Sequence, residues 1–173
     1  MATAFDNLNI VGAEYELIAY IGNQVVNGTN HAVLAKQTIL NGKDTDNIVV
    51  MIFNEKPNDM SAVLVSIDRI LESGEPFGGV HVDVATEFND EVMNIWNDAF
   101  ESFVGSTVTP YALLGTQTKT GTEYIFAATL VTTALEPEEH AMLVTINPMT
   151  KKVKMGDMLI SKHEASLGYA FTW

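Results

Sequence analysis

The feature that most constrains the fold of this chain is a sequence repeat. Residues 19–29, AYIGNQVVNGT, match residues 112–122, ALLGTQTKTGT, with Gly, Gln, Gly and Thr at equivalent positions 93 residues apart. The segments that follow, 31–40 and 124–133, continue the match. Such self-similarity indicates a duplicated supersecondary unit. We therefore expect a single compact domain, residues 1–173, made of two related halves at about 10–75 and 86–165.

A later pair of apolar segments extends the repeat with a different spacing. IVVMIF, residues 48–53, aligns with MLVTIN, residues 142–147, at an offset of 94 residues. One additional residue in the second linker would explain this change from 93 to 94.

Each half has the composition of antiparallel β-structure. Val26–Asn27–Gly28–Thr29 lies between two runs rich in β-branched and aliphatic residues, and Asn-Gly is the strongest short hairpin signal. Pro57 and Pro148 mark the next turns, because proline cannot donate to a strand ladder. We predict strands for 61–71 and for the alternating C-terminal segment 167–173, which would close the sheet of its own domain or pair with a neighbouring chain.

One segment has the period of a long amphipathic helix, residues 87–104. Thr86 can cap it and Gly105 can end it. Its apolar stripe is expected to pack on a sheet; it contains Phe88, Val92, Ile95, Trp96, Ala99, Phe100 and Phe103. The repeat offset would place a partner helix at positions −6 to 11, where the sequence is too short and lacks the period. The sequence thus predicts an α+β fold in which the two halves share one helix or the first half gets its cover from elsewhere. A homodimer that buries the open face is a further alternative.

The hairpin sequence Gln24–Val25–Val26–Asn27–Gly28 resembles the QxVxG hairpin of the cystatins, which inhibit papain-like cysteine proteases. The order of a helix followed by antiparallel strands, as in 87–160, is similar to the cystatin fold. The resemblance implies that residues Gln24–Gly28 form a wedge that enters a protease cleft. The chain departs from the family in lacking the Pro-Trp of its second hairpin, and Lys119 replaces the valine in the second copy, which we expect to be non-inhibitory.

Composition and charge narrow the function classes. The 9 Lys and Arg against 22 Asp and Glu give a net charge of −13, which disfavours nucleic acid as a partner. The absence of cysteine excludes disulfides and thiolate chemistry. No signal peptide or membrane-spanning run is apparent, so we expect a cytoplasmic protein without membrane contact, with a secreted mature form as the alternative. The four histidines lack the spacing of a metal site, and we expect no metal and no cofactor.

The sequence therefore favours a non-catalytic protein-binding module, with Gln24–Gly28 as its binding residues, no catalytic residues, and a cysteine protease or another protein as partner. Three alternatives stay open. One is a structural domain of bacterial type. Another is a small-molecule-pocket enzyme of cone-shaped α+β fold with a carboxylate such as Glu123 or Asp90 inside. The third is a nucleic-acid mimic, which the even spread of acidic residues over both halves disfavours.

Overall fold

The chain is mostly β-structure. The computed structural model describes residues 2–6, 8–41, 45–57, 61–74, 78–159 and 169–172. The residues that the model describes are 63% strand and 10% helix, and the helices are short, so the predicted α+β class with one long amphipathic helix is wrong. The chain divides into two compact units, Met1–Ser73 and Gly74–Trp173.

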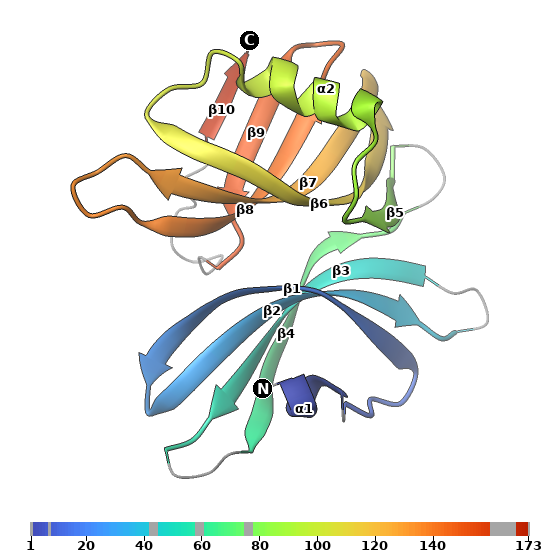
Figure 1. Ribbon diagram of the computed structural model, residues 1–173. Helices are drawn as coiled ribbons and strands as arrows, with labels where there is room; N and C mark the ends of the chain where they lie inside the picture. Colours follow the sequence, from blue (N-terminus) through green and yellow to red (C-terminus); the bar gives the residue numbers. More distant parts are fainter. Residues whose placement is uncertain are drawn as a thin grey trace. The chain divides into compact units, whose positions relative to one another are not determined.

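Unit 1 contains a short helix and a four-stranded antiparallel sheet (Figure 1). The strand order is β1-β2-β3-β4, so each strand pairs with its neighbour in the sequence. Strand β4 confirms the strand that we predicted for 61–71. The elements are α1 (Ala2–Asp6), β1 (Ala13–Val26), β2 (Gly28–Ile39), β3 (Thr45–Glu55) and β4 (Ala62–Glu72).

Unit 2 contains one helix and a six-stranded antiparallel sheet in the order β10-β9-β8-β7-β6-β5. Strand β10 pairs with β9, so the C-terminal segment closes its own sheet, as predicted. The elements are β5 (Val80–Ala85), α2 (Asp90–Phe100), β6 (Ser106–Lys119), β7 (Gly121–Thr132), β8 (Glu139–Asn147), β9 (Lys152–Asp157) and β10 (Tyr169–Thr172).

The first hairpins of the two units pair in the same register. β1 and β6 have equal lengths, and so do β2 and β7. Register shifts flank Ile18 and Ile21 in β1 and, 93 residues later, Tyr111 and Leu114 in β6. A β-bulge bends its strand and increases its twist. The two hairpins are therefore bent at equivalent points.

The offset stays at 93 residues in the next strand, so the predicted change to 94 is wrong. His31 pairs with Phe53 in unit 1, and Tyr124 pairs with Ile146 in unit 2. The sequence comparison aligned the two strands in the wrong register because both are continuous apolar runs. In such runs apolar residues still align with apolar residues after a shift of one position. A slip of one residue would turn every side chain to the opposite face of the sheet.

The amphipathic helix is shorter than the predicted 87–104. α2 covers Asp90–Phe100, and its N-cap is Asn89, whose Oδ1 accepts a hydrogen bond from the Val92 amide at 2.9 Å. Phe88 and Phe103 lie outside the helix but still pack against the same core. The helical spacing therefore overestimated the helix, because aromatic residues in the flanking loops continue its apolar stripe.

The core of unit 2 confirms that this stripe packs on a sheet. Trp96 of α2 stacks on Phe100, with ring centroids 4.5 Å apart, and meets Phe126 of β7 edge-on at 5.1 Å. In Figure 1 the helix lies across one face of the six-stranded sheet.

Unit 1 has a small helix of its own at the position where the sequence predicted none. Phe5 of α1 is buried against Phe53 of β3, with ring centroids 6.3 Å apart, and it shares a core with Val33, Val49 and Met51. Of the two arrangements that the sequence left open, cover of the first half from elsewhere describes this contact of α1 with the unit 1 core. One turn with a single phenylalanine carries too little periodicity to be recognised by its pattern.

Candidate functional site

The predicted binding residues form the tip of the β1–β2 hairpin. Val25 pairs with Thr29 and Val26 pairs with Gly28, which leaves Asn27 as the one residue between the two strands. Among these residues only Gly28 has a positive φ, of 104°. This geometry joins the strands through Asn27 alone, with Gly28 in the left-handed region that glycine favours. It differs from the two-residue Asn-Gly turn that the sequence suggested, which would need positive φ at both residues.

Gly28 is required by its surroundings as well as by its backbone conformation. A Cβ atom at this position would lie 2.2 Å from the carbonyl oxygen of Glu55 on β3. The tip is therefore held against the neighbouring strand by a contact that only glycine permits.

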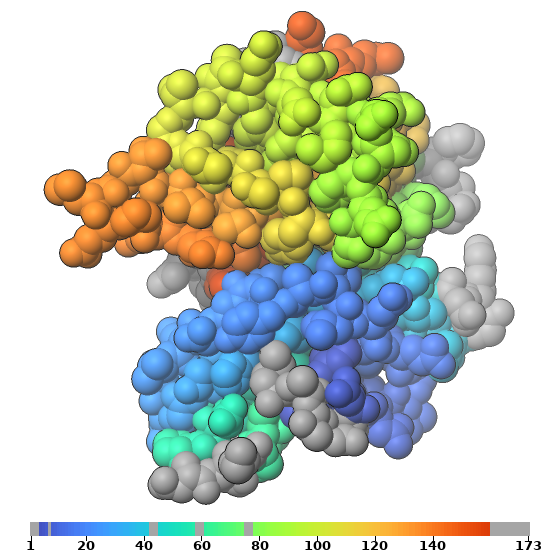
Figure 2. Space-filling model, viewed as in Figure 1, coloured from blue at the N-terminus to red at the C-terminus, as the bar shows by residue number. Residues whose placement is uncertain are grey.

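The hairpin tip exposes apolar side chains. Val25 is 82% exposed and Val26 46% exposed, and Gln24 and Asn27 are also exposed. The turn between β1 and β2 forms one end of the ribbon of unit 1 (Figure 1), and the blue atoms of this hairpin belong to the surface in the space-filling view (Figure 2). The five residues predicted from the sequence thus lie together on one protruding turn.

Polar contacts support the strands just behind the tip. Asn54 donates to Asn30 at 2.8 Å, which links β3 to β2. The hydroxyl of Tyr20 lies 3.1 Å from Nδ1 of His31. Nε2 of His31 lies 3.2 Å from Oε2 of Glu55, an ion-pair distance, but its direction does not satisfy hydrogen-bond geometry. These contacts fix the base of the hairpin and leave its tip free of side-chain hydrogen bonds to the strands.

The equivalent hairpin of unit 2 has a polar tip that is tied to its neighbours. Lys119 forms an ion pair with Glu123 at 3.2 Å, and Asn147 donates to the carbonyl oxygen of Thr120 at 2.9 Å. Gln117 donates to the carbonyl oxygen of Gly78. This hairpin therefore presents no apolar pair comparable to Val25 and Val26.

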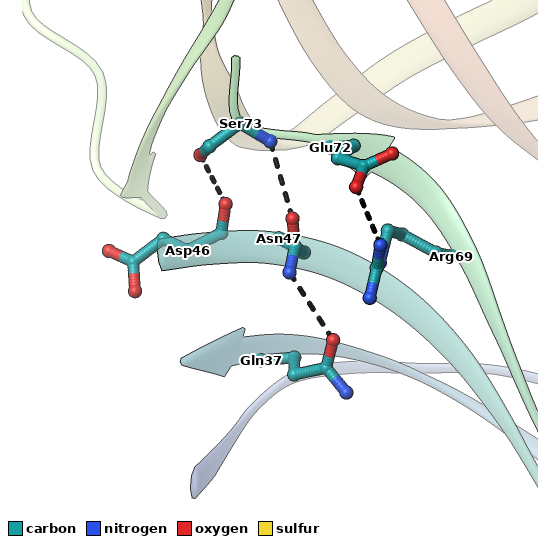
Figure 3. A network of polar contacts seen from close by, with 6 residues as sticks. All are labelled: Gln37, Asp46, Asn47, Arg69, Glu72 and Ser73. Carbon is teal, nitrogen blue, oxygen red and sulfur yellow. Dashed lines mark hydrogen bonds and ion pairs between the residues drawn. The ribbon is translucent and has the colours of Figure 1, made fainter. Parts of the chain in front are cut away.

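A second polar cluster, which sequence reasoning missed, crosses the other end of the unit 1 sheet. Gln37 donates to the Tyr15 hydroxyl at 2.8 Å and accepts from Asn47 at 3.3 Å. Asn47, only 1% exposed, accepts from the backbone amide of Ser73 at 3.3 Å. Figure 3 shows the part of this chain of contacts that runs from Gln37 through Asn47 to Ser73, whose hydroxyl also donates to the carbonyl oxygen of Asp46.

This cluster has a structural role. Buried amide side chains need hydrogen-bond partners. Here the Asn47 side chain donates to the Gln37 side chain, so each amide is a partner of the other. The cluster ties the end of β4 to β3 and β2. Polar residues at otherwise apolar positions of two buried strands were the signal that could have revealed it.

His140 is the histidine with the best-defined acidic partners in unit 2. Its Nδ1 lies 2.9 Å from Oδ2 of Asp157, and its Nε2 lies 3.6 Å from Oε2 of Glu138. Oδ1 of Asp157 accepts from the amide of Leu159 at 2.8 Å, which fixes the carboxylate. Within the described part of the chain, no group of three or more His, Asp or Glu is arranged to hold a metal ion.

A shallow pocket of about 240 Å³ lies between α2 and the β8–β9 turn. Ile95, Asp98, Glu101, Pro148 and Lys151 line it. It does not contain Asp90 or Glu123, the carboxylates that the pocket-enzyme alternative named. The two carboxylates and one lysine are charged surface groups, and the pocket offers no paired acid and base of a catalytic site.

Comparison with protein-family models, with curated proteins and with solved structures gave no match. None of the helices among the described residues is long and apolar enough to cross a membrane. The functional argument therefore depends on the geometry of the site.

Proposed function

We propose that this chain is a non-catalytic protein-binding module that binds its partner through the hairpin tip Gln24–Gly28. The observation that supports this best is the exposure of Val25 and Val26, 82% and 46%, at a turn. Turns generally carry polar residues and glycine. Fully burying one valine side chain contributes roughly 1.5–3 kcal/mol, so this pair can contribute substantially to an interface.

The structure around the tip favours binding in a second way, through its rigidity. The positive φ of Gly28, the close approach of Glu55 to Gly28 and the hydrogen bond between Asn54 and Asn30 restrict the backbone before any partner arrives. A contact segment that is already ordered loses little conformational entropy on docking.

The chemistry of the tip favours an apolar cleft as its binding site. Gln24, Val25, Val26 and Asn27 carry no charge, so docking would bury no ionised group. The resemblance of these residues to the cystatin hairpin makes papain-like cysteine proteases the first partner class to test. The homodimer and the cytoplasmic location stay predictions.

Titration of papain with the purified chain tests the proposal. We expect inhibition by the native chain and its loss in the double variant Val25→Asp/Val26→Asp, because two carboxylates at the tip would have to be desolvated in the cleft. The matched control is Thr118→Asp/Thr120→Asp, which places two carboxylates on the exposed tip of the other hairpin and should inhibit as the native chain does. Circular dichroism establishes that each variant is folded.

Two results would remove the protease as partner. One is the absence of inhibition at micromolar concentrations of the native chain. The other is equal inhibition by the native chain and the Val25→Asp/Val26→Asp variant, which would place any contact elsewhere.

A further inference from the structure

The outer edge of β1 lacks the neighbouring strand that its counterpart in unit 2 has. There β5 pairs antiparallel with β6, with Val80 opposite Gln117 and Val82 opposite Gly115. The equivalent part of β1 is residues 20–24. Within the described residues this part pairs only with β2, because β1 is the first strand of its sheet.

The backbone of β1 nevertheless resembles that of β6, whose outer edge is paired with β5. A Cβ atom on Gly115 would lie 2.1 Å from the carbonyl oxygen of His81, so β5 can approach β6 only because this residue is glycine. Gly22 is the equivalent residue of β1, and its φ of 156° is close to the 153° of Gly115. Both glycines directly follow the second bulge of their strand. Unit 1 therefore keeps the glycine and the bend that in unit 2 admit a further strand.

The edge is also accessible. Tyr20 is 48% exposed, and Asn23 and Gln24 are exposed, whereas their equivalents in unit 2 are half-buried. Gly22 is half-buried, whereas Gly115 is buried. A strand edge presents unpaired N–H and C=O groups, which proteins commonly protect with lysine or proline. The sequence of β1, AEYELIAYIGNQVV, contains neither.

We propose that the outer edge of β1 at residues 20–24 binds an extended segment of another protein as an added antiparallel strand. The segment would occupy the position that β5 has on β6. This mode of recognition relies on main-chain hydrogen bonds, with alternate side chains adding specificity. This surface is a backbone edge that shares only Gln24 with the hairpin tip, and it does not depend on the side chains of Val25 and Val26.

The chemistry of the edge specifies the segment. β5 provides the model, with Val80, Val82 and Val84 alternating along a short strand. The bound segment should carry basic residues between its apolar ones, because Glu14 and Glu16 lie on the same strand and the chain has a net charge of −13. A partner strand of about five or six residues, β-branched and basic in alternation, fits these conditions.

A peptide with the β5 sequence, with Asp83 replaced by Lys and a lysine added at each end, is a direct probe. We expect it to shift the backbone amide signals of residues 20–24 in the nuclear magnetic resonance spectrum of the full chain. The signals of residues 113–117 should not shift. A scrambled peptide of the same composition is the control for charge alone.

Proline substitution tests whether the backbone edge carries the binding. Successive amides of a strand point to opposite edges, so one of Asn23→Pro and Gln24→Pro removes only an outward donor. That variant is recognised by an unchanged melting temperature, and it should weaken peptide binding at least about tenfold, equivalent to 1.4 kcal/mol. The tip variant Val25→Asp/Val26→Asp should bind the peptide within about twofold of the native chain.

Several results would overturn the proposal. They are the absence of shifts at residues 20–24 with millimolar peptide, shifts confined to residues 113–117, and undiminished binding by the proline variant that keeps its melting temperature. Shifts at residues 20–24 that depend on protein concentration without peptide would also contradict it, because a second copy of the chain would then occupy the edge. Failure of papain inhibition would not affect this test.

Discussion

The four-stranded sheet of unit 1 and the six-stranded sheet of unit 2 share the geometry of their first hairpin and differ in the helices and strands that surround it. The bulges and hairpin lengths coincide at a constant offset of 93 residues. Unit 2 adds an eleven-residue helix and the edge strand β5, whereas unit 1 has one helical turn and an open edge. The comparison teaches that bulges and glycines specify the hairpin, while the covering elements vary.

One pair of residues on neighbouring strands, Val108 and Leu130 in unit 2, shows how the helix that covers a sheet determines the residues beneath it. The two lie opposite each other on β6 and β7 and pack with the aromatic residues of α2. The equivalent residues of unit 1 are Tyr15 and Gln37, which bond to each other. Where the apolar side of α2 covers the sheet, these two residues are apolar, and in unit 1 the equivalent two form a hydrogen bond with each other.

The largest effect that we expect concerns the two helices. Trp96→Ala should destabilise unit 2 by about 3–5 kcal/mol, because it removes a large side chain packed between Phe100 and Phe126. Phe5→Ala should cost unit 1 less than this, because α1 contributes one aromatic residue to its core. Hydrogen exchange of the buried amides of each unit measures the two effects separately. Equal losses would show that the two helices are equally important to their units.

The two hairpin glycines should respond differently to the same change. Gly28→Ala is expected to cost about 2–3 kcal/mol, since the residue has φ of 104° and its new Cβ would collide with the Glu55 carbonyl. Gly121→Ala should cost about 1 kcal/mol, because its Cβ would meet the side chain of Met149, which can move. Urea denaturation of both variants checks this ranking. A larger loss for Gly121→Ala would contradict it.

Replacing Gln37 by leucine, the residue at the equivalent position 130 of unit 2, tests the hydrogen bonds that join Tyr15, Gln37 and Asn47. Gln37→Leu should destabilise unit 1 by about 2 kcal/mol, because it leaves the buried amide of Asn47 without its acceptor. Leu130→Met, which keeps the apolar character of the equivalent position, is the matched control and should cost less than about 1.5 kcal/mol. Thermal unfolding measures both variants. A stabilising effect of Gln37→Leu would show that unit 1 gains nothing from these hydrogen bonds.

The smallest effect concerns the bulge residue Tyr111, whose buried hydroxyl has no hydrogen-bond partner among the residues that the structure describes. Burial raises the pKa of Tyr111 to about 12 from an ordinary 10.0. Between these values the unfolded chain loses this proton and the folded chain keeps it, so rising pH favours unfolding. Tyr111→Phe should raise the free energy of unfolding by about 1 kcal/mol at neutral pH.

The same variant should show a smaller loss of stability than the native chain between pH 10 and pH 12. Urea denaturation at several pH values measures this difference, and Tyr20→Phe, at an exposed tyrosine, is the control for the substitution. An identical alkaline loss in the native and Tyr111→Phe chains would contradict the assignment.

The sequence by itself determined the strands, the hairpin and the location of the candidate site. Period-2 patterning, the glycine turn at Asn27–Gly28 and the repeat are local properties, and each strand of the first hairpins lies where they placed it. The alternation VHVDVA of β5 is also a local pattern typical of a strand. The predicted tip residues lie together because they are contiguous in the chain.

Only the tertiary structure decided the helix ends, the strand register and the hydrogen bonds of Gln37. Phe88 and Phe103 bury their rings without being helical, because burial depends on the sheet beneath them and not on the local backbone. The register of β8 follows from pairing with β7, and Gln37 finds Asn47 only across a strand pair. Such contacts join residues distant in the sequence, so their energies do not appear in any local pattern.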